Sequence, residues 1–233
     1  MSDQAVIARP RRIAARAGAP AAPSALSALG VAALCAAGLV IVWVLAELVP
    51  ALRLKDAVAL YDFTTLNGPH VQRPLNFLLH LLDPALFVLW GVALVAVALA
   101  GERPRSAVAI VAVLGLAPLT AEQLKPLVAH AHDSYNFVSI GSASWPSGHA
   151  TAATALALCA VLAAPPKLRR WVAVLAAAFV VAVSIALLVL AWHMPSDVIG
   201  GILLSSLWMA LAVAALRFSE RVIPPGDADP ARA

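Results

Sequence analysis

Charged residues are scarce in this chain of 233 residues. Only 12% of its residues are Asp, Glu, Lys or Arg, and 62% are hydrophobic. An ordinary soluble domain has about 25% charged and roughly 45 to 50% apolar residues. The composition therefore excludes an ordinary soluble protein and indicates an integral membrane protein.

Cysteine is also nearly absent, as are the common metal and nucleotide motifs. Cys35 and Cys159 both lie in apolar segments, where each is interpreted as a small hydrophobic residue that supports no disulfide or metal site. The sequence has no Cys₄, His₃ or HExxH arrangement and few close-set carboxylates, so we expect no metal and no cofactor. It contains no glycine-rich nucleotide motif, internal repeat or coiled-coil pattern.

Long hydrophobic runs, in contrast, are abundant. A membrane-spanning helix needs about 20 mostly apolar residues. Six segments are candidates, three of them only with flanking residues included: 26–49, 84–100, 106–121, 149–164, 171–192 and 198–216. The first is longer than the roughly 7 to 15 apolar residues of a signal peptide, so an uncleaved span is predicted.

These runs predict the fold class. We expect an all-α, polytopic membrane protein with about six transmembrane helices in one bundle; five spans plus a re-entrant segment are the alternative. The membrane domain is predicted over residues 25–217, between mobile tails at 1–24 and 218–233. A helix at the membrane interface is expected within 50–74, before the break at Asn67-Gly68-Pro69. His70 and His80, in or near this loop, are interpreted as solvated side chains.

The basic residues are distributed unevenly along the predicted bundle. Of 16 lysines and arginines, only Arg53, Lys55, Arg73 and Lys125 lie in segments on one side of it. By the positive-inside rule, both termini are cytoplasmic and the loops at 50–83, 122–148 and 193–197 face outward. The net charge of +4 is thus explained by membrane topology and implies no nucleic-acid partner. The expected location is the plasma membrane.

Two short motifs carry the polar chemistry of the apolar part of the chain. Pro146-Ser147-Gly148-His149 opens an Ala-rich apolar segment. Pro and Ser suit a helix start, and Gly lets a ligand approach the backbone. Free N–H groups at a helix N-terminus favour an anion.

The second motif follows the fifth apolar segment. His193 comes directly after Trp192, Pro195 breaks the helix, and Asp197 stands four residues after His193, where its carboxylate could reach the imidazole. A carboxylate makes an imidazole a better nucleophile, and a second imidazole can protonate a leaving group. With Lys125, these groups indicate phosphoryl transfer.

In order and spacing, the motifs resemble the type 2 phosphatidic acid phosphatase superfamily. That family carries Lys-x₆-Arg-Pro, then Pro-Ser-Gly-His, then Ser-Arg-x₅-His-x₃-Asp, and the resemblance covers about residues 26–217. It implies a metal-independent phosphatase of lipid phosphomonoesters or pyrophosphates, with its active site at the extracytoplasmic rim. The substrate class implied is phosphatidic acid, phosphatidylglycerol phosphate or a polyprenyl pyrophosphate.

The resemblance also implies a role for each matching residue. His193 would attack phosphorus, Asp197 would orient it, and His149 would protonate the leaving oxygen and then activate water. The phosphate would be held by Lys125, Ser147 and the backbone of Gly148.

Both motif arginines of the family are missing. His132-Asp133 replaces Arg-Pro, and Ala186-Leu187 replaces Ser-Arg. An arginine is always charged and bidentate, whereas a histidine is cationic only when its pKa, about 6.5, is raised. We expect His132 to bind phosphate in place of the first arginine, because a bound dianion favours its protonated form.

The missing arginines leave alternatives open. His130 or Arg73 could also supply charge to an active enzyme, or the enzyme could act on an unusual substrate. The alternative function is a catalytically weak or inactive membrane protein that binds or carries lipid phosphates. Soluble vanadate-dependent haloperoxidases, distant relatives, rely on the arginines absent here.

Overall fold

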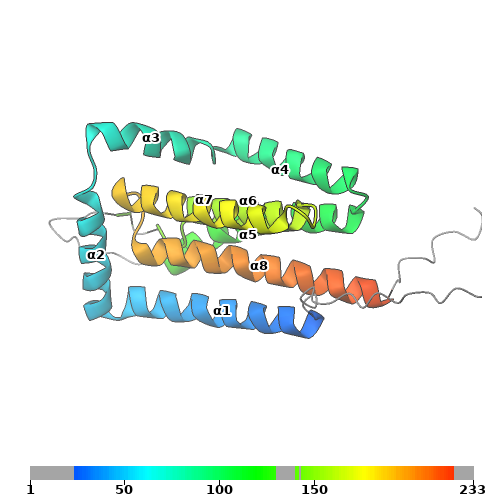
Figure 1. Ribbon diagram of the computed structural model, residues 1–233. Coiled ribbons are helices and arrows are strands. Elements are labelled where there is room, and N and C mark those ends of the chain that lie inside the picture. Colours follow the sequence, from blue (N-terminus) through cyan, green and yellow to red (C-terminus); the bar gives the residue numbers. More distant parts are fainter. Residues whose placement is uncertain (1–23, 130–139, 142, 223–233) are drawn as a thin grey trace, which may run out of the picture.

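The computed structural model describes residues 24–129, 140–141 and 143–222, and its regular secondary structure is helical (Figure 1). No β-strand occurs among these residues. The helices are α1 (Ala25–Leu48), α2 (Pro50–Thr64), α3 (Pro69–His80), α4 (Pro84–Ala100), α5 (Pro104–Val128), α6 (Gly148–Ala163), α7 (Arg169–Val189) and α8 (Pro195–Val222).

Proline or a capping serine sets most helix starts. The Ser24 side chain accepts the backbone N–H of Ser27 at the start of α1, and Ser147 caps α6 in the same way. Five helices begin with proline, namely α2, α3, α4, α5 and α8. Proline suits the first position because it has no N–H to leave unpaired and its φ is already helical.

The six predicted spans correspond to six helices that run roughly along one direction, and α2 crosses one end of the bundle (Figure 1). Helix α2 lies within 50–74, the range in which a helix at the membrane interface is expected. Helix α6 is the centre: it contacts α4, α5, α7 and α8 and is largely buried, while α1 packs along α8.

Length separates the six helices into two groups. By length and composition α1, α5, α7 and α8 can each cross a membrane, and α3 with α4, bent by 55° at their junction, forms a fifth candidate span. With 16 residues, α6 is about 24 Å long, less than the roughly 30 Å of a hydrocarbon core. The all-α, polytopic membrane class is confirmed, with four to five candidate spans and α6 as a shorter central helix.

The two ends of the described chain lie at the same end of the bundle. The start of α1 and the end of α8 lie at one end, opposite α2 (Figure 1). Helix α8 continues to Val222, past the predicted domain boundary at 217. The rest of the predicted tails, 1–23 and 223–233, lies outside the described residues.

Candidate active site

Two consecutive glycines let α8 approach the start of α6 closely. A Cβ added to Gly201 would lie 2.7 Å from the Ser147 carbonyl oxygen and 2.9 Å from the Thr151 nitrogen. One added to Gly200 would lie 2.8 Å from Nε1 of Trp145. Because real Cβ atoms do not come this close, side chains at these positions would push the two elements apart. The glycines thus bring the two polar motifs together.

His193 and Asp197 form the pair that their spacing predicts. Nδ1 of His193 lies 3.2 Å from Oδ2 of Asp197, and the same oxygen accepts the Met194 N–H at 2.9 Å. The Asp197 side chain is only 1% exposed, so its carboxylate is held away from water. The pair favours the tautomer with its proton on Nδ1, which leaves the Nε2 lone pair of His193 available to a substrate.

His149 lies beside this pair. It is the second residue of α6, and its ring meets that of Trp192 edge to face, with centroids 5.4 Å apart. It interacts electrostatically with His193, with Lys125 and, across the α3–α4 junction, with His80 and Asp83. The two motif histidines therefore share one region at the α2 end of the bundle.

An ion pair covers the N-terminus of α6. Lys125 Nζ donates to Glu122 Oε1 at 2.6 Å. A Cβ on Gly148 would lie 3.2 Å from that oxygen and 3.6 Å from Nζ. Any other residue at position 148 would therefore require the Glu122 side chain to shift slightly. Lys125 and the first N–H groups of α6 together favour an anion here. In this structure the ammonium group of Lys125 is paired with the carboxylate of Glu122.

Ser147 is fully buried and has a structural bond already. Its Oγ accepts the Ala150 N–H at 3.3 Å as the cap of α6. Because a hydroxyl can donate and accept together, this cap does not use the hydroxyl proton. The predicted double role of Ser147 is compatible with this geometry.

Helix α2 contributes a carboxylate that the motifs do not contain. Asp56 Oδ2 accepts the Ser196 hydroxyl at 2.5 Å, and Oδ1 accepts the Ser196 N–H at 3.2 Å. Burial raises the pKa of Asp56; the two Ser196 bonds oppose this rise, and the charges of Asp197 and Glu47 add to it. Asp56 thus fixes the first turn of α8 next to Asp197, from 140 residues away in sequence.

The expected replacements for the missing arginines are not brought together in the described structure. His132 and His130 lie outside the described residues, and Arg73 is exposed on α3. Leu187 is fully buried, and its carbonyl accepts the Trp192 N–H at 2.9 Å. Over the described ranges, no group of three or more His, Cys, Asp or Glu side chains could hold a metal ion.

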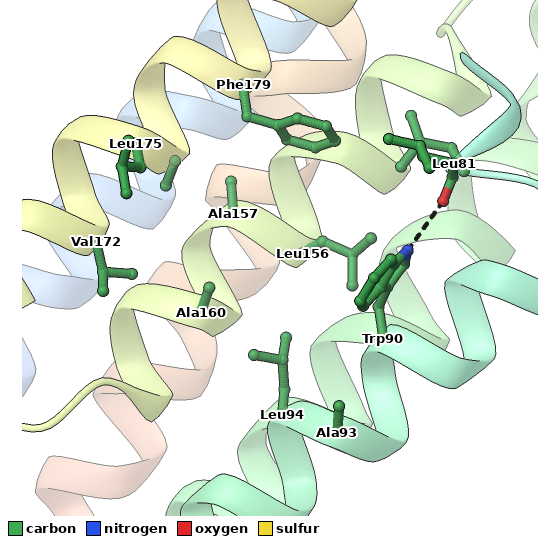
Figure 2. Close-up of a pocket in the computed structure, with 12 residues that line it drawn as sticks. Leu81, Trp90, Ala93, Leu94, Leu156, Ala157, Ala160, Val172, Leu175 and Phe179 are labelled. Carbon is green, nitrogen blue, oxygen red and sulfur yellow. Dashed lines mark hydrogen bonds between the residues drawn. The ribbon is translucent and has the colours of Figure 1, made fainter. Parts of the chain in front are cut away.

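An apolar cavity of about 370 Å³, open to the outside of the bundle, lies between α4, α6 and α7 (Figure 2); exposed side chains such as Leu175 form part of its lining. Leu81 and Leu82 of the α3–α4 junction line it, with Trp90, Leu156 and Phe179 among the others, and Trp90 Nε1 donates to the Leu81 carbonyl at 3.1 Å. Leu156 lies two turns along α6 from His149, about 10 Å. The cavity therefore begins within reach of the histidine region.

Comparisons with known proteins identify the family. The PAP2 superfamily model matches residues 105–221, half of the chain. A search of curated proteins gives no match. The crystal structure described as the first transmembrane PAP2 type phosphatidylglycerolphosphate phosphatase from Bacillus subtilis is similar, with a TM-score of 0.67 and 20% identity over 83% of this chain and 98% of that chain. That likeness shows the fold, and with the matching family model it means that the chain belongs to the PAP2 superfamily.

Proposed function

We propose that the protein is an integral membrane phosphatase that hydrolyses lipid phosphomonoesters or pyrophosphates through a phosphohistidine intermediate. The observation that carries the proposal is the His193–Asp197 pair, joined at 3.2 Å, with His149 beside it on the adjoining helix. Membership of the PAP2 superfamily supports the reaction class. We place the protein in the plasma membrane, with both termini cytoplasmic and the histidines facing outward.

The first half-reaction transfers the phosphoryl group to His193. Its Nε2 lone pair attacks phosphorus, an N–P bond forms, and the bond from phosphorus to the leaving oxygen breaks. His149 gives its proton to that oxygen, while Asp197 stabilises the positive charge on the phosphorylated imidazole.

Water completes the cycle. His149, now neutral, takes a proton from a water molecule whose oxygen attacks phosphorus, and the N–P bond breaks to release inorganic phosphate and His193. Lys125, the Ser147 hydroxyl and the N–H groups at Gly148 hold the phosphate oxygens. His132 would add charge when protonated. No step in this cycle requires a metal ion.

The apolar cavity supports an amphiphilic substrate. A lipid whose phosphate reaches His193 can place part of its hydrocarbon tail between α4, α6 and α7, where Leu156 and Phe179 offer apolar contacts. The similar Bacillus subtilis structure is described as a phosphatidylglycerolphosphate phosphatase, which makes that lipid one candidate. Phosphatidic acid and a polyprenyl pyrophosphate present the same combination of phosphate and tail.

The test is phosphate release by detergent-purified protein across a panel of these lipids. We expect release from the wild type and a loss of at least ~1,000-fold in His193→Ala, because the nucleophile is gone. The matched control is His70→Ala, which removes an exposed histidine of α3. Equal release from wild type and His193→Ala would refute the proposed reaction.

One observation favours a second candidate function. Leu187 stands where the family has an arginine, and it is fully buried, so this position supplies no charge to a phosphate. A protein that binds or carries lipid phosphates without hydrolysing them would fit such a site. It would bind the lipid in both wild type and His193→Ala and release phosphate from neither.

A further inference from the structure

We propose that the recess at the end of the bundle opposite the histidines binds the headgroup of an anionic phospholipid. The recess has a volume of about 720 Å³ and lies between the ends of α5, α6, α7 and α8. It is separate from the candidate active site and does not depend on the proposed reaction.

The recess exists because α6 is shorter than its neighbours. Helix α6 ends at Ala163, whereas α8 has 28 residues and continues beyond it. The last turns of α6 therefore form part of an apolar base, with side chains of α8 beside them. The apolar lining residues are Leu158, Val161, Leu162, Met209, Val213 and Leu216.

Two arginines fix the shape of the recess. Arg103 donates to the carbonyl oxygens of Leu162 at 3.2 Å and Ala164 at 3.4 Å, and also to that of Ala163. Arg169 donates to Ala164 as well, at 3.4 Å. These bonds satisfy the last carbonyl groups of α6. The guanidinium groups are thus held in place before any ligand arrives.

The charge of the lining is positive. The recess is lined by four arginines and two glutamates, which gives it a net charge of +2: Arg103, Arg105, Arg169 and Arg217, with Glu102 and Glu220. Arg217 Nη1 lies 2.9 Å from Glu220 Oε2, but both side chains are partly exposed, so the pair is exchangeable. Arg105 and Ser106 also belong to the first turn of α5, whose N–H groups and dipole favour an anion.

A phospholipid fits this combination better than a free anion does. Guanidinium groups bind phosphate oxygens in a bidentate way, and the apolar base suits the glycerol-proximal part of an acyl chain. Most of the lysines and arginines in the described ranges also lie at this end of the bundle. That end would face the leaflet in which basic pockets between helices bind anionic headgroups.

Binding can be measured on the full-length protein in detergent by native mass spectrometry and by the melting temperature. The probe is phosphatidylglycerol, a phosphodiester, so it is not a substrate of the proposed phosphomonoesterase. Phosphatidylcholine and inorganic phosphate are the comparison ligands. We expect bound phosphatidylglycerol and a higher melting temperature, with a much smaller effect of either comparison ligand. An equal effect of phosphatidylcholine or of inorganic phosphate would overturn the proposal.

Variants then locate the site. We expect Arg105→Gln with Arg217→Gln to weaken phosphatidylglycerol binding by at least ~10-fold, because two charge-assisted contacts are lost. Lys167→Gln with Arg170→Gln removes the same charge from residues outside the recess and should bind like the wild type. The single variant Arg105→Gln, at an exposed position, should show an intermediate loss. Equal affinity of the recess variants and the control would contradict the assignment.

Discussion

The backbone N–H of Ser147 donates a hydrogen bond of 3.0 Å to the backbone carbonyl of Asp197. This single bond joins the motif that holds His149 to the motif that holds His193. It needs no side chain, so it depends only on how closely the two backbones approach. The relative position of the two histidines therefore depends on the glycines that allow this approach.

The substitution Gly201→Ala should disturb this junction. Its Cβ would meet the Ser147 carbonyl oxygen at 2.7 Å, and backbone atoms cannot move aside as a flexible side chain can. We expect a loss of stability of about 1 to 3 kcal/mol from overpacking. Phosphate release should fall about 100-fold, because a shift of about 1 Å between reacting groups has effects of that size.

The control for this variant is Gly115→Ala on α5, where a Cβ would meet nothing within 4 Å. There the substitution should be neutral or stabilise by up to about 1 kcal/mol, since alanine is the better helix former. Thermal unfolding in detergent and phosphate release measure both effects. Equal behaviour of the two variants would show that the close approach at Gly201 has no role.

Asp56 should act as a positioning residue. Asp56→Ala removes both acceptors of Ser196 and loosens the first turn of α8, so kcat should fall about 10-fold. KM should change little, because Asp56 binds Ser196 and no substrate group is assigned to it. The control is Asp62→Ala, an exposed aspartate of the same helix. A change confined to KM would contradict the positioning role.

The ionisation of Asp56 should also affect stability. Because burial raises the pKa of Asp56 in the folded protein, the folded state holds this proton more tightly than the unfolded state does. Its contribution to stability is complete below the ordinary pKa of an aspartate, about 3.9, and is lost as pH rises through the raised folded value. The melting temperature of wild type relative to Asp56→Asn should therefore increase as pH is lowered through this window. A constant difference would contradict the raised pKa.

The ion pair of Glu122 and Lys125 should tune phosphate binding. Lys125→Ala should raise KM about 10-fold through the loss of a charge-assisted contact. Glu122→Gln should lower KM about 3-fold, because the carboxylate at 2.6 Å no longer competes with a phosphate for Nζ. Steady-state kinetics at fixed ionic strength measures both. A higher KM in Glu122→Gln would mean that Glu122 holds Lys125 in place instead.

The residue at position 132 should determine the alkaline limb of activity. If His132 binds phosphate in place of an arginine, activity should fall as pH rises past its pKa. Arginine stays charged throughout, so His132→Arg should flatten that limb. The measurement is kcat/KM against pH for both proteins. An alkaline limb that the variant leaves unchanged would exclude this role of His132.

The parts that depend on local spacing were predictable from sequence. His193 lies just before α8 and Asp197 in its first turn, so their contact depends on a short stretch of local chain. The prolines at 50, 69, 84, 104 and 195 are each the first residue of a helix, a position that proline favours. Glu122 is also a local partner of Lys125, three residues away, yet sequence reasoning considered Lys125 alone. An apolar run specifies a helix but not its surroundings, so the central, protein-covered position of α6 did not follow from its composition.

The parts that depend on distant contacts were not predictable. Asp56 is an ordinary acidic residue of a mixed segment, and only the path of α2 across the bundle end brings it to Ser196. In the same way, Gly200 and Gly201 could be taken for any pair of glycines in an apolar helix. Their close approach to Trp145 and Ser147 requires the packing of two helices that sequence alone does not orient.

Asp56 on α2 lies outside the part of the chain that the family model matches. The family model begins at residue 105, but Asp56 and the helix that packs along α8 both precede it. A fragment limited to 105–221 would retain both histidines and lose Asp56, the carboxylate that binds Ser196 in the first turn of α8. We therefore expect the N-terminal helices to belong to the smallest piece of this chain that keeps the proposed site assembled, and substitutions in them to change turnover without touching either motif.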